Sequence, residues 1–279
     1  MIEMGLQEEA KRRFGKYRKR KYKGVLVSAV AILYFVFIGF HVDYSKIQDV
    51  FSGIGKILIE LSIVLVFFVI YIIGLLIIQG SGIEIQKILF EECNPYLYEA
   101  CLRKCRVLWK RDAFTCTLAA AKYYQGDKEQ MYHELQSIQV FKLKRTALVN
   151  YYSLMSDYYF SHGLQDRVSE LEQACARSIG RGKNNQKQYR IFCASNNLRR
   201  AMANEDYGAA FQFLMEIKEL QGSNGNRLFL VIHHMWEARI YLALGEKESA
   251  KVNLDYVVEK GGCLGIVNQA KRLLKTTQI

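Results

Sequence analysis

The sequence predicts an all-α protein in which a two-helix transmembrane hairpin precedes an α-solenoid of helix pairs. Two uncharged apolar runs near the start of the chain predict the hairpin. Apolar residues that recur at helical spacing across residues 96–279, in a chain with a single proline, predict the helices that follow. Turn-like segments at regular intervals divide these helices into pairs.

Both apolar runs are long enough to cross a bilayer. Residues 24–40 form 17 consecutive uncharged residues, and residues 61–78 form 18. A helix that crosses the hydrocarbon core needs about 20 apolar residues, with about 17 as the lower end. Two other interpretations stay open, a cleaved signal peptide for the first run and two buried helices of a soluble core. The first run exceeds the roughly 7–15 residues of a signal core, and no small-residue cleavage site follows it.

The distribution of positive charge predicts the orientation. Nine Lys and Arg residues precede the first run, whereas the connector, residues 41–60, has only Lys46 and Lys56 as basic residues. Because Lys and Arg beside a span stay on the cytoplasmic side, we expect both termini in the cytoplasm. All seven cysteines follow the second run, and their odd number agrees with a reducing compartment. No organelle-targeting segment is visible, which favours a bacterial plasma membrane.

These observations divide the chain into five segments. The basic N-terminal segment, residues 1–23, is expected to lie against anionic lipids, since each basic residue near such a surface contributes about 1 kcal/mol of binding free energy. It contains nothing similar to a base-reading module, so we expect no nucleic-acid partner. The segments are a basic cytoplasmic segment (1–23), a first transmembrane helix (24–42), a short extracytoplasmic loop (43–56), a second transmembrane helix (57–79) and a cytoplasmic repeat domain (80–279).

Four turns in the last segment share one local pattern. They fall at positions 126, 163, 205 and 245, at spacings of 37, 42 and 40 residues. An aromatic or apolar residue ends one helix, a tight turn follows, and a small or apolar residue about five positions later packs back. Residues 123–131 and 241–250 show the pattern most clearly, and residues 264–279 are expected to form a capping helix.

This pattern resembles the tetratricopeptide repeat (TPR), a family of antiparallel helix pairs that repeats at about 34 residues. The resemblance covers roughly residues 112–262 and is specific in the turns. The chain departs from the family in three ways: it lacks the proline that ends each repeat, Glu205 replaces a turn glycine, and the spacings are longer. An unrelated helical bundle is the alternative.

The resemblance implies a concave groove lined by the first helix of each pair. The family's groove position, six residues before the turn, falls on Ala120, Asp157, Arg199 and Arg239. Two arginines on neighbouring pairs could bind carboxylates with their guanidinium forks, which predicts an acidic peptide or protein tail as the partner. An ordinary solvated surface is the alternative. The predicted partner-binding residues are Asn150, Asp157, Ser195, Arg199 and Arg239.

No motif of a known catalytic class is present, so the sequence predicts neither an enzyme nor a cofactor or metal site. Cys101 and Cys105 are placed on one helical face, where packing is the simpler role, and the adjacent His233 and His234 point about 100° apart on a helix and cannot chelate together. The predicted function is a membrane-anchored scaffold that binds proteins. The alternatives are a subunit or regulator of a larger membrane complex, to which residues 24–28 could offer a small-residue seam, and an enzyme with an unrecognised site.

Overall fold

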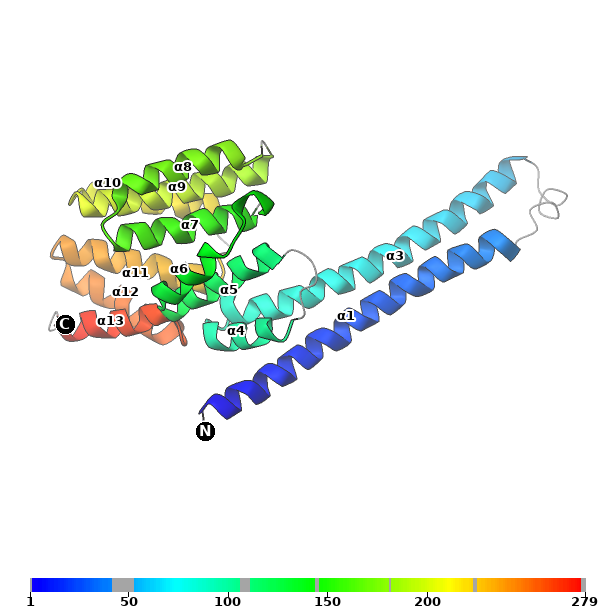
Figure 1. The fold of residues 1–279 in the computed structure, drawn as a ribbon, viewed down its shortest axis with the longest axis horizontal. Helices are drawn as coiled ribbons and strands as arrows, with labels where there is room; N and C mark the ends of the chain where they lie inside the picture. The colour runs from blue at the N-terminus through cyan, green and yellow to red at the C-terminus, as the bar shows by residue number, and fades with distance from the viewer. Residues whose placement is uncertain are drawn as a thin grey trace. The chain divides into compact units, whose positions relative to one another are not determined.

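A computed structural model describes residues 2–41, 53–105, 111–143, 146–180, 182–222 and 225–276, and every regular element within these ranges is helical (Figure 1). The predicted all-α class is therefore confirmed. The chain divides into a hairpin unit, residues 3–86, and a helical unit, residues 87–279. The hairpin unit consists of α1 (Ile2–His41) and most of α3 (Gly53–Phe90). The helical unit contains α4 (Pro95–Arg103), α5 (Arg111–Gln125), α6 (Lys128–Gln136), the 3₁₀ turn η1 (Val140–Lys142), α7 (Thr146–Ser161), α8 (Gln165–Ser178), α9 (Lys183–Ala203), α10 (Tyr207–Gln221), α11 (Arg227–Ala243), α12 (Lys247–Lys260) and α13 (Gly265–Thr276).

Both hairpin helices are longer than the predicted spans. α1 includes almost all of the basic segment, because nothing between residues 2 and 41 interrupts the helix. α3 begins at Gly53, so the last four residues of the predicted loop (43–56) are helical, while residues 43–52 lie outside the described part of the chain. α3 also continues beyond residue 79 to Phe90, and its last turn belongs to the helical unit.

The two hairpin helices run antiparallel along a seam of small residues. A Cβ added at Gly24 would lie 2.9 Å from the carbonyl oxygen of Gly74, and one added at Gly74 would meet Ser28. The rings of Phe35 and Phe67 lie 4.6 Å apart toward one end of the seam. Small residues let helix backbones approach closely, which is how helices associate where lipid removes the hydrophobic driving force. The predicted small-residue seam is thus occupied by the chain's own second helix.

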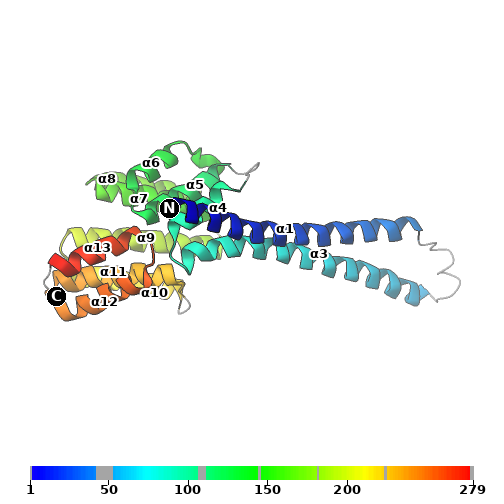
Figure 2. The same ribbon diagram turned by 90° about the horizontal axis from the view of Figure 1, so that it is seen from below.

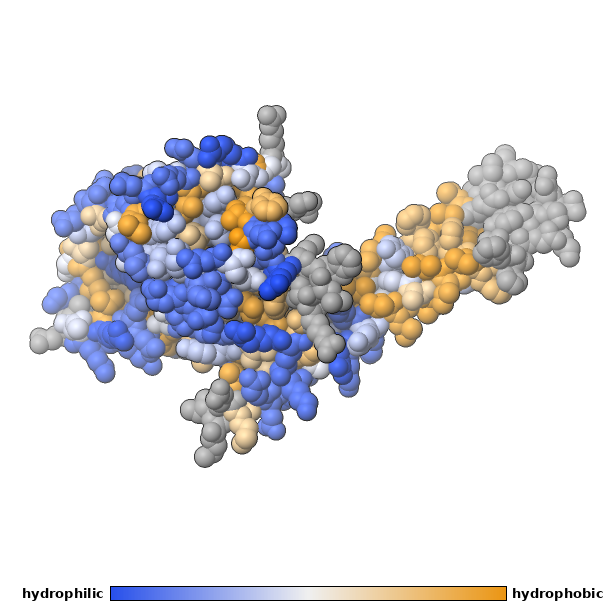
Figure 3. All heavy atoms as spheres, in the orientation of Figure 1, coloured by the Kyte–Doolittle hydropathy of each residue, from blue (hydrophilic) through white to orange (hydrophobic). Residues whose placement is uncertain are grey.

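Apolar side chains cover the outside of the hairpin (Figure 3). The structure has two helices long and apolar enough to cross a membrane, Met4–Ile38 and Leu61–Phe90. Only 17% and 6% of their apolar windows is buried inside the protein. A helix from a soluble core buries its apolar residues, so these low fractions argue against the interpretation as buried core helices.

The helices of the helical unit form antiparallel pairs joined by tight turns. In the described ranges these pairs are α5 with α6, α7 with α8, α9 with α10, and α11 with α12. The four predicted turn positions all adopt the left-handed backbone region, with φ of 89° at Gly126, 70° at Gly163, 59° at Glu205 and 79° at Gly245. Helices commonly end on such a residue, and glycine adopts this conformation at little cost.

Side-chain caps explain where several second helices begin. Asp127 and Asp206 directly follow two of the turns and accept hydrogen bonds from the backbone N–H groups of Gln130 and Ala209, both at 3.0 Å. Such caps satisfy amides that have no partner inside the helix. The helix α9 begins at Lys183, where Gly182 is the capping residue and no side chain caps the helix.

The helices of this unit contact one another in sequence, and the last helix contacts the first of the paired helices, α5. α5 contacts α7, α7 contacts α9, α9 contacts α10 and α10 contacts α11; α13 then contacts both α11 and α5. The backbone N–H of Cys263 donates to the carbonyl oxygen of Cys93 at 3.0 Å. A Cβ on Gly265 would lie 2.6 Å from the carbonyl oxygen of Gln125, so this contact requires glycine.

The predicted capping helix is present as α13 (Figure 2). It buries Val267 and Ala270 as expected. It does more than cover the last pair, because it also reaches the first helix. The contacts therefore form a closed ring rather than an array with two separate ends. We call this arrangement the helix ring.

Candidate functional site

The helix ring contains a partly open cavity of about 590 Å³. Residues of α5, α7, α9, α10 and α11 line it, together with Tyr98 of α4 and the end of α3. Small-molecule sites in proteins have volumes of roughly 300–1,000 Å³ and are mostly apolar with a few polar groups. The size of this cavity therefore lies within the range of a binding site. We call it the ring cavity.

Most of the ring cavity wall is apolar. The aromatic rings of Phe90, Tyr124, Phe229 and Trp236 line it and are only partly buried, which leaves part of each ring exposed. Such aromatic surface contributes strongly to binding when a ligand covers it. The wall therefore favours a ligand with an apolar body.

The charged groups of the wall are all cationic. Lys187 and Arg199 are the only charged side chains among the described residues that line the ring cavity, and no Asp or Glu is among them. Charges of one sign in a concave, low-dielectric site attract ligands of the opposite sign. The cavity is therefore electrostatically suited to an anionic or neutral ligand.

Three of the five predicted partner-binding residues line the ring cavity. Asn150 is exposed on α7, and Ser195 on α9 donates through Oγ to the carbonyl oxygen of Ile191 at 2.8 Å. Arg199 lies one turn after Ser195 on the same helix. Asp157 and Arg239 are not among the residues that line the cavity.

Asp157 is the centre of a buried ion network rather than a residue of an open groove. Its Oδ1 accepts hydrogen bonds from Arg199 Nη2 at 2.8 Å and from the Tyr123 hydroxyl at 3.2 Å, and its Oδ2 lies 2.8 Å from Lys128 Nζ. Burial alone would raise the pKa of Asp157, but the charges of Arg199 and Lys128 hold this pKa below its ordinary value. The network ties together the first three helix pairs.

The two predicted carboxylate-binding arginines do not form one clamp. Arg199 already contacts Asp157 and also donates Nη1 to the carbonyl oxygen of Ser195 at 3.4 Å. Arg239 instead donates Nη2 to Gln269 at 2.8 Å, and its guanidinium lies 4.9 Å from the ring centroid of Trp236. Burial lowers the pKa of Arg239. The expected paired fork is therefore wrong for Arg199, whose guanidinium is used inside the protein.

His233 is a cavity residue that the sequence did not identify. Its side chain lines the ring cavity, is only 2% exposed, and has no hydrogen-bond partner at either ring nitrogen. Nε2 lies 3.2 Å from Glu237 Oε1, a contact that becomes an ion pair when the ring is protonated. The neighbouring His234 instead pairs with Asn253 at 2.6 Å. The adjacency of the two histidines gave no signal of which one faces the interior.

Metal ligands do not gather in the part of the chain that the structure describes, where no group of three His, Cys, Asp or Glu side chains could hold an ion. The expectation that Cys101 and Cys105 share one helical face is wrong, since α4 ends at Arg103 and Cys105 lies in the turn that follows. Its Sγ lies 3.6 Å from the carbonyl oxygen of Cys101.

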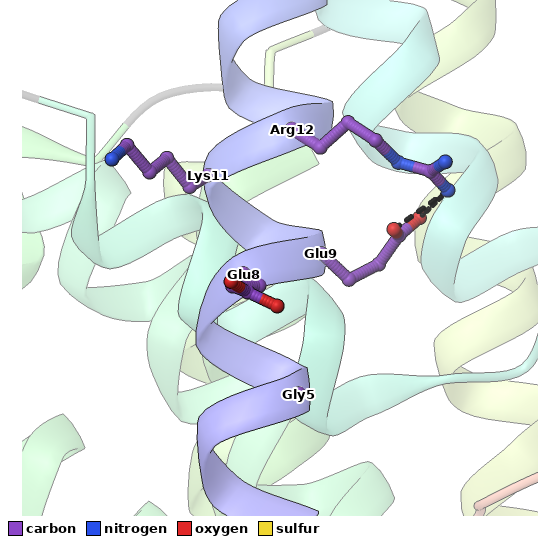
Figure 4. Close-up of a pocket in the computed structure, with 5 residues that line it drawn as sticks. All are labelled: Gly5, Glu8, Glu9, Lys11 and Arg12. Carbon is purple, nitrogen blue, oxygen red and sulfur yellow. Dashed lines mark hydrogen bonds and ion pairs between the residues drawn. The ribbon is translucent and has the colours of Figure 1, made fainter.

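A second depression lies on α1 and is formed by Gly5, Glu8, Glu9, Lys11 and Arg12 (Figure 4). Glu9 accepts hydrogen bonds from Arg12 Nη2 and Arg13 Nε, both at 2.8 Å. The residues of this depression all come from the first turns of one helix, and the Glu9 carboxylate is already paired with Arg12 and Arg13. The ring cavity is therefore the stronger candidate site.

Comparison with protein-family models, with curated proteins and with solved structures finds no match to this chain. The functional argument accordingly depends on the hairpin, the helix ring and the ring cavity.

Proposed function

We propose that this protein is a membrane-anchored scaffold whose helical unit binds a protein partner at the cytoplasmic face. The apolar exterior of the hairpin supports the anchor, because both helices expose long apolar surfaces that water would not tolerate. The seam between α1 and α3 supports a retained first helix rather than a cleaved signal, because α1 packs on α3 along its apolar run.

In this proposal the two spans place both termini in the cytoplasm. The basic residues of α1 lie beside the first span and contact anionic lipid headgroups of the inner leaflet. The helical unit is then a TPR-like domain. Its support is the left-handed residue at each of the four turns, at the positions where the repeat pattern expects them.

The partner is proposed to be an acidic peptide or protein tail that enters at Asn150. The observation that carries this proposal is the ring cavity, with its exposed aromatic surface and its wall free of carboxylates in the described residues. Buried aromatic anchors dominate binding energy at protein interfaces. A subunit of a larger membrane complex remains the second candidate, but the small-residue seam that would have favoured it is used within the hairpin.

Site-specific photocrosslinking in native membranes tests the partner. A photoreactive phenylalanine is introduced at Asn150, which lines the ring cavity, and separately at Val252, which is 71% exposed on α12 and does not line it. We expect one protein to crosslink from Asn150 and not from Val252. Equal products from the two positions, or no product from Asn150, would contradict the proposal.

Thiol labelling tests the orientation. Cys263 is exposed, whereas burial raises the pKa of Cys116 and Cys175 to about 12 and keeps these thiols protonated and inaccessible. A membrane-impermeant maleimide should label Cys263 in inside-out vesicles and not in intact cells. Cys263→Ser should reduce this signal to that of the partly buried Cys105 and Cys193, and a Cys263-dependent signal from intact cells would rule out the proposed topology.

A further inference from the structure

The ring cavity has features that a protein scaffold does not need. It lies inside a closed ring of helices, and it is bounded partly by Leu89 and Phe90 at the end of α3. Its volume of about 590 Å³ lies within the range of small-molecule pockets. A hollow of this size can hold a small molecule as well as one end of a peptide.

The apolar wall selects for one part of such a ligand. Phe229 and Trp236 both lie on α11 and line the cavity with partly exposed rings. Ile191 and Ile232 add aliphatic surface that is also partly exposed. Covering apolar surface contributes about 25 cal/mol per Å², so an apolar body would bind here.

The charges around the cavity favour an acid group on the ligand. Lys187 has no ion pair among the described residues, and Arg199 is the other charged residue of the wall. Asp157, the carboxylate nearest to Arg199, is already bound by Arg199, Lys128 and Tyr123. An anion in the cavity would pair with Lys187.

His233 supplies a separate indication of a ligand. A buried polar side chain without a hydrogen bond costs about 1–3 kcal/mol, so native proteins nearly always satisfy such groups. Nδ1 of His233 has no hydrogen-bond partner, and Nε2 has only the Glu237 carboxylate at 3.2 Å, although the side chain is 2% exposed and lines the cavity. A polar group on a ligand in the cavity would satisfy Nδ1.

We propose that the ring cavity binds a small amphipathic anion, with an apolar body against the aromatic wall, an acid group held by Lys187 and a hydrogen bond to Nδ1 of His233. This site goes beyond the proposed protein partner, which contacts the cavity at the exposed Asn150. Binding of the small acid tests the cavity alone, and crosslinking from Asn150 tests the protein partner, so the two proposals can fail separately.

The probe is 1-naphthaleneacetate, and the matched control ligand is the neutral 1-naphthaleneacetamide. Equilibrium dialysis uses the full chain in lipid nanodiscs, with empty nanodiscs to subtract partition into lipid. We expect saturable binding at one site per chain, and an affinity for the acid about tenfold above that for the amide, which corresponds to about 1.4 kcal/mol. Binding no greater than to empty nanodiscs, or equal affinity for acid and amide, would overturn the proposal.

Three variants locate the site. Lys187→Gln changes an exposed side chain and should weaken binding of the acid about threefold without affecting the amide. His233→Leu should weaken binding of both ligands about threefold or more, and its thermal unfolding is measured alongside, because the substitution also removes a partner of Glu237. Lys251→Gln, on an exposed position of α12 outside the cavity, should change nothing. Lys187 is exposed, so its substitution should leave the protein core unchanged. Unchanged binding of the acid to Lys187→Gln would therefore place the ligand elsewhere and refute the site.

Discussion

The hairpin unit and the helical unit differ in where they place large apolar side chains, which the hairpin exposes and the helical unit buries. The hairpin exposes large apolar residues, such as Leu33 at 67% and Leu65 at 63%, and buries small ones along its seam. The helical unit buries leucines such as Leu198 at 1% and Leu254 at 0%, and polar networks such as that around Asp157 join its helices. A lipid solvent gives little reason to bury apolar surface, so close packing along the seam and side-chain contacts such as Arg20 with Glu84 and Phe35 with Phe67 hold the hairpin. Water drives apolar burial in the helical unit, and its polar networks select which helices pair.

The largest expected loss of stability comes from removing the buried carboxylate of the polar network in the helical unit. Asp157→Ala leaves Arg199 and Lys128 without their carboxylate, and removing one partner of a buried ion pair costs about 3–5 kcal/mol. We expect a matching loss in the free energy of unfolding of the helical unit, measured by chemical denaturation in nanodiscs. Asp166→Ala, on an exposed position of α8, is the control and should cost less than about 0.5 kcal/mol. Similar losses in the two variants would show that the network does not stabilise the ring.

The next effect breaks the seam of the hairpin. Gly74→Leu would push a side chain against Ser28 and the carbonyl oxygen of Gly24, and overpacking of this kind costs about 1–3 kcal/mol. We expect a lower yield of disulfide crosslinking between cysteines introduced at Phe35 and Phe67, whose rings now lie 4.6 Å apart. Gly82→Leu is the matched control, because a Cβ there meets nothing within 4 Å. Equal yields in the two variants would exclude the seam as the contact that holds the hairpin.

Acid should weaken the helical unit and not the seam. The pKa of Asp157 is lower in the folded protein than its ordinary value, so the folded state stabilises its charged form. This contribution is fully present above an ordinary carboxyl pKa of about 4, and it is lost as the pH falls below that value toward the folded pKa. The difference in unfolding free energy between the protein and Asp157→Asn should therefore shrink from pH 7 to pH 3. A difference that stays constant over this range would contradict the ion network.

The smallest expected changes in the free energy of unfolding come from the turn residues of the helical unit. Glu205 adopts a φ of 59°, where a residue with a Cβ is disfavoured by roughly 1–2 kcal/mol, while the other three turn positions are glycine. Glu205→Gly should raise the unfolding free energy by up to about 1 kcal/mol, and Gly163→Ala, at a φ of 70° with open space around it, should lower it by a similar amount. Thermal unfolding of the two variants measures both changes. A decrease in Glu205→Gly would mean that the glutamate side chain has a stabilising contact that outweighs backbone strain.

The sequence predicted features that local physics determines. An uncharged run of 17 or 18 residues has few alternatives to a long exposed helix, and the turns at Gly126, Gly163 and Gly245 follow from the conformational freedom of glycine. The helix boundaries of α9 and the length of α3 were less predictable, because neighbouring packing decides where a helix without a proline ends.

Contacts between residues that are far apart in the sequence were not predictable from the local sequence pattern. The sequence places Asp157 and Arg199 at equivalent positions on neighbouring first helices, but it does not show that the two side chains bind each other. The contact of Gly265 with Gln125 joins residues far apart in the chain, and no local signal marks it. The unsatisfied His233 also became visible only once all the helices around it were placed.

Closure of the helix ring fixes how many pairs the domain can hold. Duplicating or deleting one pair would enlarge or reduce the circumference and separate Cys263 from Cys93, so that both the backbone bond and the glycine contact at Gly265 would be lost together. Open repeat arrays tolerate such changes in copy number because each unit contacts only its neighbours. This domain should instead evolve by point substitution within a constant architecture, and a chain with one inserted pair should fail to close.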